Sequence, residues 1–257
     1  MQSKFADVHP NARIHNNVTI SSFTTIYEDV EIGEGSWIGP NVTIMDGARI
    51  GKNVQIWPGS VVSAIPQDLK YKGELTTFEI GDNTVIREMC TLNKGTTDRM
   101  KTVIGKNCLI MAACHVAHDA IVGDHVICAN LVGITGHVVV EDWAILEGLV
   151  GAQQFIRIGA HSFLAGGTLV RKNVPPYCKA AREPISYIGV NSVGLMRRGF
   201  SKEVIQQIED IYRIIFVRGY NMTKALEAVE AECPDTKERK QILDFIRESK
   251  DGIIRGI

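Results

Sequence analysis

The stretch VHPNARIHNNVTISSFTTIYEDVEIGEGSWIGPNVTIMDGARIGKNVQIWPGSVV, residues 8–62, decides the fold. Within it a branched aliphatic residue recurs at every sixth position without exception: Val8, Ile14, Ile20, Ile26, Ile32, Ile38, Ile44, Ile50, Ile56 and Val62. Neither an α-helix, with its period of 3.6, nor a half-buried strand, with its period of two, produces this spacing. A period of six is typical of a parallel β-helix, in which each hexad forms one short strand and one corner.

The repeat also predicts how the coils stack. Three hexads close a triangular coil of about 18 residues, and successive coils should lie roughly 4.8 Å apart. The aliphatic phase continues to Val170, because 23 of the 28 sixth positions between Val8 and Val170 are Ile, Val or Leu. The whole chain is only 45% hydrophobic, so chance does not explain this run. We therefore predict a mainly β fold, a parallel β-helix of hexapeptide repeats.

Two loops should interrupt the coils. Asp68, Glu74 and Asp98 break the aliphatic phase and predict excursions over residues 63–79 and 95–102. The first excursion contains the segment Pro66-Gln67-Asp68-Leu69-Lys70-Tyr71. Long loops that leave a regular scaffold are frequent carriers of function, so we expect part of the site on them.

The chain beyond the ladder should be helical. Two prolines at Pro175-Pro176 remove backbone donors and predict the end of the strands, which gives a β-helical domain at 1–176. Residues 177–257 then form a connector and a C-terminal helical domain. A first long helix should begin after Ser201, a second should cover 223–231, and a third should begin with a capping box at Asp235 and stop at Gly252. Covering the open end of the solenoid is the simplest role for these helices.

Composition narrows the class of protein. The formal net charge is −1, which argues against nucleic acid as a partner. No apolar stretch is long enough for a transmembrane helix or a signal peptide, so we expect a cytoplasmic protein. Six cysteines occur without a Cys-x-x-Cys pair and mostly at core positions of the repeat, which favours a reducing compartment over a disulfide or zinc framework.

A polar cluster interrupts the otherwise apolar repeat. Adding one coil to His118 gives Gly136 and two coils give Gln154, while one coil added to Asp119 gives His137. One edge of the prism should therefore carry His115, His118, Asp119, Gly136, His137 and Gln154. Imidazole titrates near neutral pH, and an adjacent carboxylate can orient it, so this edge is a candidate acid–base site.

Several segments together resemble the UDP-N-acetylglucosamine O-acyltransferases, which catalyse the first step of lipid A synthesis. They are Cys114-His115-Val116-Ala117-His118-Asp119, Gly136-His137, Gln154-Phe155, the Gln67-to-Tyr71 loop and Gly194-Leu195-Met196-Arg197-Arg198-Gly199-Phe200-Ser201. The resemblance implies a left-handed helix, a homotrimer and active sites between prisms. It also implies transfer of an (R)-3-hydroxyacyl chain from acyl carrier protein to the 3-position of UDP-N-acetylglucosamine, without a cofactor or a metal.

The same resemblance assigns roles to residues. It makes His118 the general base, Asp119 its orienting carboxylate and Gly136 the backbone donor to the oxyanion. It assigns His115, His137 and Gln154 to the sugar and acyl-donor site, and Gly166 to the end of the acyl groove. It further assigns Gln67, Asp68 and Lys70 to the nucleotide sugar from a neighbouring chain, and Asn191, Arg197 and Arg198 to the uridine diphosphate. Our coil count separates the Gln67–Lys70 loop from His118 by about three coils, which favours this contribution from a neighbour.

Two departures from the family pattern leave sugar recognition open. Gln153 stands in place of a histidine and Val193 in place of a glutamate, so the acceptor could carry a 3-hydroxyl or a 3-amino group. Three other functions compete with the first. A hexapeptide-repeat sugar acetyltransferase would use acetyl-CoA, and a γ-type carbonic anhydrase would hold zinc or iron with His115, His118 and His137. A non-catalytic solenoid would have no use for the loop at Gln67.

Overall fold

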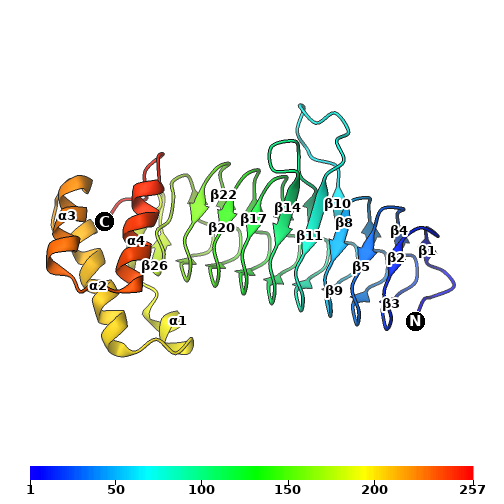
Figure 1. The fold of residues 1–257 in the computed structure, drawn as a ribbon, viewed down its shortest axis with the longest axis horizontal. Helices are drawn as coiled ribbons and strands as arrows, with labels where there is room; N and C mark the ends of the chain where they lie inside the picture. Colours follow the sequence, from blue (N-terminus) through cyan, green and yellow to red (C-terminus); the bar gives the residue numbers. More distant parts are fainter. Residues whose placement is uncertain (257) are drawn as a thin grey trace.

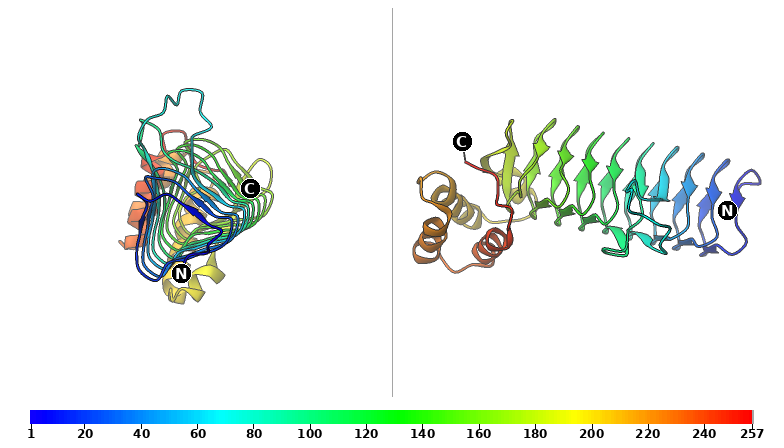
Figure 2. Two further views of the ribbon diagram at one scale, coloured as in Figure 1. Left: turned by 90° about the vertical axis from the view of Figure 1, so that its right-hand side faces the viewer. Right: turned by 90° about the horizontal axis from the view of Figure 1, so that it is seen from above.

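The computed structural model describes residues 1–256 and forms a long three-sided prism that is closed at one end by helices (Figure 1). Most strands are two residues long and pair in parallel with the strand of the next coil. The end-on view in Figure 2 shows the triangular cross-section. The repeat thus forms the parallel β-helix that its period of six predicts.

Three sheets make the sides of the prism. The first contains β1 (Asp7–Val8), β4 (Thr25–Ile26), β7 (Thr43–Ile44), β10 (Val61–Ala64), β13 (Thr91–Asn93), β16 (His115–Val116), β19 (Gly133–Ile134), β22 (Gly151–Ala152) and β25 (Leu169–Val170). The second contains β2 (Arg13–Ile14), β5 (Glu31–Ile32), β8 (Ala48–Ile50), β11 (Thr77–Ile80), β14 (Lys101–Ile104), β17 (Ile121–Val122), β20 (Val139–Val140) and β23 (Arg157–Ile158). The third contains β3 (Thr19–Ile20), β6 (Trp37–Ile38), β9 (Gln55–Ile56), β12 (Val85–Ile86), β15 (Leu109–Ile110), β18 (Ile127–Cys128), β21 (Ile145–Leu146), β24 (Phe163–Leu164), β26 (Cys178–Ala181) and β27 (Ser186–Val190).

The interior is the aliphatic ladder. Ile32, Ile38 and Ile44 are successive members of the repeat, one on each side of the prism, and all three are 0% exposed. The small residues lie where the corners narrow, and the cysteines Cys90, Cys108, Cys114 and Cys128 are buried as expected. Because the interior takes the aliphatic and the small side chain of each hexad, the remaining positions at the corners are free to carry polar chemistry.

Both excursions are shorter than expected. The first runs over 65–76 between β10 and β11, and the second over 94–100 between β13 and β14. Val61 pairs with Thr91, and Thr91 pairs with His115, so these two coils contain 30 and 24 residues. The insertions therefore add multiples of six, which explains why the aliphatic phase survives them. Only two strand steps separate β10 from β16.

The ladder does not end at the prolines. β26 continues the third sheet in parallel with β24, and β27 then pairs with β26 antiparallel. The expected stop was wrong because Pro175 and Pro176 lie in the connection before β26, where no sheet hydrogen bond is needed from them. Whether residue 176 is also a domain boundary stays a prediction.

In the described part of the chain, four helices follow the strands: α1 (Ser192–Arg197), α2 (Lys202–Phe216), α3 (Met222–Glu232) and α4 (Lys237–Glu248). Ser201 caps α2 as expected, since its side chain accepts a hydrogen bond from the backbone N–H of Val204. The expected cap of the last helix at Asp235 was wrong. Thr236 caps α4 instead, and the Asp235 carboxylate pairs with Arg239. Among residues 1–256, no helix combines the length and apolarity needed to cross a membrane.

Candidate active site

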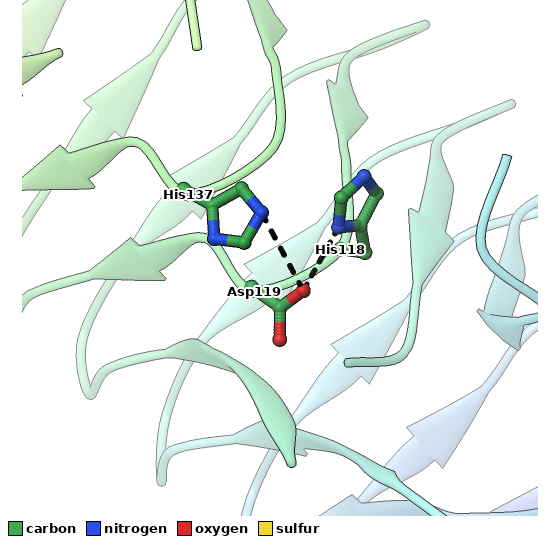
Figure 3. A group of neighbouring side chains, drawn as sticks. All are labelled: His118, Asp119 and His137. Carbon is green, nitrogen blue, oxygen red and sulfur yellow. Dashed lines mark hydrogen bonds and ion pairs between the residues drawn. The ribbon is translucent and has the colours of Figure 1, made fainter. Parts of the chain in front are cut away.

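An imidazole and a carboxylate form the centre of the site, at the corner between the first and second sheets (Figure 3). Nδ1 of His118 lies 2.8 Å from Oδ2 of Asp119. Asp119 is 0% exposed, and His118 is only 6% exposed. Asp119 adopts a left-handed backbone conformation, with φ near 59°, which turns the chain between β16 and β17. A hydrogen bond at Nδ1 leaves Nε2 as the ring atom that can accept a proton.

The second excursion surrounds the Asp119 carboxylate with donors. Oδ1 accepts hydrogen bonds from the backbone N–H groups of Thr96 at 3.0 Å and Arg99 at 3.1 Å, and Oδ2 accepts one from the Thr96 hydroxyl at 2.7 Å. Burial alone would raise the pKa of Asp119, but the bonds from Thr96, His118 and Arg99 outweigh it, and its pKa lies below the ordinary value. The carboxylate is therefore ionised beside His118 at neutral pH.

The first excursion reaches the same imidazole from the other side. Oδ2 of Asp68 lies 4.0 Å from Nε2 of His118 in the same chain. Our expectation that this loop lies about three coils away was wrong, because the coils that carry the insertions are longer and only two strand steps intervene. Gln67 and Lys70 are exposed on the loop, and the backbone N–H of Lys70 donates to Oδ1 of Asp68.

Gly136 lies against the imidazole, one coil beyond His118. A Cβ atom at Gly136 would lie 2.8 Å from Cε1 and 2.9 Å from Nε2 of His118. Contacts this short are essentially absent between real Cβ atoms and their neighbours, so any other residue here would have to displace the imidazole ring or the backbone. The hydrogen bonds of the described backbone leave the Gly136 N–H without a protein acceptor. A backbone donor without a protein acceptor, in a residue packed against the imidazole, is available to stabilise an oxyanion.

His137 packs beside the pair. Its ring makes an edge contact with His118 at 5.2 Å between centroids and stacks on Phe155 at 4.6 Å. Its Nε2 lies 4.0 Å from Oδ2 of Asp119, and its buried Nδ1 lies 3.1 Å from Oδ2 of Asp98 without hydrogen-bond geometry. Figure 3 shows both rings facing Asp119.

Donor atoms of His118, Asp119 and His137 all lie within 4.8 Å of one another, a spacing that a metal ion could use. His115, which the metalloenzyme alternative requires, does not belong to this group among the described residues. The Asp119 oxygens already accept four hydrogen bonds, and this is how a carboxylate that orients an imidazole is held.

His115 and Gln154 flank the site on neighbouring coils. The His115 ring on β16 bonds through Nδ1 to the Thr91 hydroxyl at 2.8 Å. Its partial burial lowers its pKa, and the nearby His118 lowers it further, against the effect of Thr91. Gln154 is exposed one coil beyond Gly136. The coil arithmetic thus places His115, His118, Gly136, His137 and Gln154 in one region.

The arginine segment lies on a different corner. Arg198 contacts the ring of Trp143, 5.2 Å from its centroid, and its Nη1 lies 3.3 Å from Nδ1 of His161. Trp143 lies between β20 and β21, at the corner that joins the second and third sheets. Asn191 caps α1 by accepting from the Gly194 N–H, and its Nδ2 donates to the His161 carbonyl. Arg197 lies in the last turn of α1. Within one chain, Asn191, Arg197 and Arg198 therefore do not share the corner of His118.

Gly166 lies at the third corner, between β24 and β25. Its N–H donates to Oε2 of Glu147 at 3.2 Å, and a Cβ atom would lie 3.2 Å from the Gly148 carbonyl. The left-handed conformation at this corner belongs to Gly167, with φ near +71°, rather than to Gly166. The turn itself therefore does not require a glycine at Gly166.

Sequence reasoning missed Thr96 and Arg99. Both lie in the excursion that interrupts the repeat, so no periodic signal connects them to Asp119. One feature could have suggested their role: the excursion that carries them begins after β13, which lies one coil before the strand of His115 and thus near His118.

The comparisons with known families place this hexapeptide-repeat β-helix among the hexapeptide-repeat transferases. Residues 29–64 match the family described as bacterial transferase hexapeptide (six repeats). Residues 173–254 match the family described as UDP-N-acetylglucosamine O-acyltransferase, domain 2.

Relatives that match most of the chain give the same family. An acyl-[acyl-carrier-protein]–UDP-N-acetylglucosamine O-acyltransferase of Thiobacillus denitrificans is 44% identical over 191 residues, 74% of each chain. The solved UDP-N-acetylglucosamine acyltransferase of Bacteroides fragilis is 46% identical, with a TM-score of 0.97 over 99% of this chain and 100% of that one. The corresponding structure from Acinetobacter baumannii is 39% identical, with a TM-score of 0.95 over 99% of each chain. The chain belongs to the UDP-N-acetylglucosamine O-acyltransferase family, and its β-helix is left-handed.

Proposed function

We propose that this protein transfers an (R)-3-hydroxyacyl chain from acyl carrier protein to the 3-position of UDP-N-acetylglucosamine, the first step of lipid A synthesis. The family membership supports the reaction. The His118–Asp119 pair, whose imidazole lies against the Gly136 backbone, is the observation that places the reaction at this corner in our proposal. Acyl transfer needs a base and an oxyanion donor around one carbonyl carbon, and this corner offers both.

In this mechanism Nε2 of His118 accepts the first proton. A sugar hydroxyl is a weak nucleophile near neutral pH, so the imidazole removes its proton as the oxygen attacks the thioester carbonyl carbon. The new carbon–oxygen bond gives a tetrahedral intermediate. When the carbon–sulfur bond breaks, the imidazolium returns the proton to the departing thiolate, and the base is regenerated.

Asp119 and Gly136 support these steps in different ways. The ionised Asp119 carboxylate fixes the ring through Nδ1, so that Nε2 faces the acceptor, and it stabilises the imidazolium. The Gly136 N–H donates to the oxygen that gains negative charge in the intermediate. Both interactions are preorganised, since each partner is held by the packing of its coil.

Substrate binding draws on the surrounding residues. We assign Asp68, Gln67 and Lys70 of the first excursion to the nucleotide sugar, and His115, His137 and Gln154 to the sugar and the acyl donor. The 4.0 Å approach of Asp68 to His118 supports a sugar position directly at Nε2. Gly166 would end the acyl groove. We assign the phosphates to Arg197 and Arg198, whose guanidinium groups suit phosphate oxygens, and the uridine to Asn191.

A trimer would complete the site. Asn191, Arg197 and Arg198 lie on another corner than His118, so a nucleotide sugar that meets both sets needs two chains. We therefore propose a homotrimer with each site between two prisms, which predicts a trimer in sedimentation equilibrium; an active monomer would contradict it. Six free cysteines support a cytoplasmic location.

The decisive experiment compares donors with one preparation of the protein. Hydroxyacyl-acyl carrier protein and acetyl-CoA are offered with UDP-N-acetylglucosamine, and the product is measured by mass spectrometry. We expect transfer only from the carrier protein, and His118→Ala should lose about 10²–10⁴-fold in rate while it keeps its fold and assembly. Transfer from acetyl-CoA alone, or activity of His118→Ala within about threefold of wild type, would contradict the proposal.

A further inference from the structure

We infer that Thr96, in the second excursion, is a positioning residue for the reaction, which holds the Asp119 carboxylate in line with His118. This inference rests on the proposed function. The Thr96 hydroxyl donates to Oδ2 of Asp119 at 2.7 Å, and this is the same oxygen that bonds to Nδ1 of His118 at 2.8 Å. The backbone N–H of Thr96 binds the other oxygen at 3.0 Å. One residue thus contacts both oxygens of the carboxylate.

Two contacts by one residue restrict rotation of the carboxylate. A carboxyl group rotates readily about its Cβ–Cγ bond, because this sp³–sp² torsion has a broad energy minimum. With Oδ1 held by two backbone donors and Oδ2 held by the hydroxyl, only one orientation satisfies all of them. That orientation points Oδ2 at the imidazole. Without the hydroxyl, His118 would be the sole donor to Oδ2 and would have to hold the group by itself.

The loop around Thr96 is built closely onto the prism. A Cβ atom at Gly95 would lie 2.3 Å from the backbone nitrogen of Lys101, so the chain can turn here only at a glycine. The Thr76 hydroxyl donates to the Gly95 carbonyl at 2.6 Å and fixes the start of the turn. Thr96 itself is 8% exposed, and its hydroxyl also accepts from the N–H of Asp98. The hydroxyl therefore has a fixed direction.

Other charged groups face this pair and would influence its titration. Asp68 lies 4.0 Å from Nε2 of His118, and His115 and His137 flank the ring. Asp98 lies beside His137, and Arg99 donates from Nη1 to the Asp119 carbonyl. A substitution at Thr96 changes none of these side chains. Any change in the titration of His118 would then come through Asp119.

The test removes only the hydroxyl. Thr96→Val keeps the shape of the side chain, Thr96→Ser keeps the hydroxyl, and Thr84→Val is the matched control. The buried Thr84 hydroxyl also donates one hydrogen bond and accepts one, but with Gly105 and Cys108. Thr96→Ala, which only deletes atoms, replaces the valine variant if that variant does not fold.

Two readouts are needed, the steady-state kinetics and the titration of His118 followed by NMR of the labelled imidazole. For Thr96→Val we expect kcat to fall about 10–100-fold, with KM for both substrates changed less than about threefold. The NMR titration curve of the His118 ring should differ from that of the wild type, because its carboxylate partner is held less well. Thr96→Ser should restore both values, and Thr84→Val should change neither.

Two results would overturn the inference. One is wild-type kcat and wild-type titration in Thr96→Val. The other is a loss of activity that Thr96→Ser does not restore and that leaves the titration unchanged, which would make Thr96 merely structural. Failure of the wild-type protein to transfer any acyl group would instead refute the proposed function. In that case the NMR titration would still report whether Thr96 acts on the His118–Asp119 pair.

Discussion

Gly136→Ala adds a single methyl group at the point of closest contact with the imidazole. The new Cβ atom would lie 2.8 Å from Cε1 and 2.9 Å from Nε2 of His118, whereas ordinary contact begins at 3.4 Å. The ring or the Gly136 backbone must therefore move by about 0.6 Å. Since Nδ1 is bonded to a carboxylate that cannot follow, the ring moves at the expense of its hydrogen bond to Asp119. A misplacement approaching 1 Å can reduce the rate about 10²-fold.

We expect kcat of Gly136→Ala to fall about 10–100-fold, while the melting temperature changes little because Gly136 has no left-handed φ to lose. The assay is hydroxyacyl transfer to UDP-N-acetylglucosamine, combined with NMR of the His118 ring. Gly133→Ala is the matched control, because it adds the same methyl group in the same coil and its Cβ atom would meet nothing within 4 Å. An unchanged rate and an unmoved His118 resonance in Gly136→Ala would refute the reasoning.

Three further substitutions test other parts of the molecule. Arg198→Ala should raise KM for the UDP-sugar and leave KM for the donor unchanged, since it removes a charge-assisted contact to phosphate; the reverse result would assign Arg198 to the carrier-protein surface. Gly166→Met should shift donor preference from about fourteen carbons toward about ten, because each methylene kept out of the groove forfeits about 0.8 kcal/mol; a uniform loss with all chain lengths would contradict the groove assignment. Burial and the nearby Arg198 lower the pKa of His161 to about 4 in the folded protein, whereas in the unfolded chain its pKa is the ordinary 6.5. Its contribution to stability is complete above pH 6.5 and is lost as pH falls toward 4, by up to about 3 kcal/mol, so urea unfolding of His161→Gln should depend less on pH in this window.

The regular part of the fold was predictable because one physical constraint repeats. Each coil must bury an aliphatic side chain on every side, and Ile32, Ile38 and Ile44 satisfy this without exception. The same regularity made coil arithmetic sound beyond the second excursion. It correctly brought Gly136 and His137 beside His118 and Asp119, because the coils from His115 to Gly151 contain 18 residues each.

The irregular part was not predictable from the same rule. Asp68 was expected three coils from His118 because the residues between them were counted as regular coils, whereas the excursions lengthen two coils and bring Asp68 to 4.0 Å. Thr96 was missed for a similar reason, since a loop carries no period that would show where it folds back. Short-range capping was also misjudged at Asp235, where Thr236 offers its hydroxyl to the helix and Asp235 binds Arg239 instead.

The two kinds of structure make different contributions to the site. Stacked coils supply groups at a fixed spacing, such as His118, Gly136 and His137, but they cannot surround a buried carboxylate, because a corner offers few donors that point inward. Asp119 at such a corner would be costly to bury if its oxygens had only His118 as a partner. The second excursion provides the missing donors through Thr96 and Arg99, and the insertion leaves the aliphatic phase intact because it adds a multiple of six residues. The loop leaves the prism after β13 and returns at β14, outside the stacked strands. The core therefore does not depend on the sequence of the loop, which is free to serve the site.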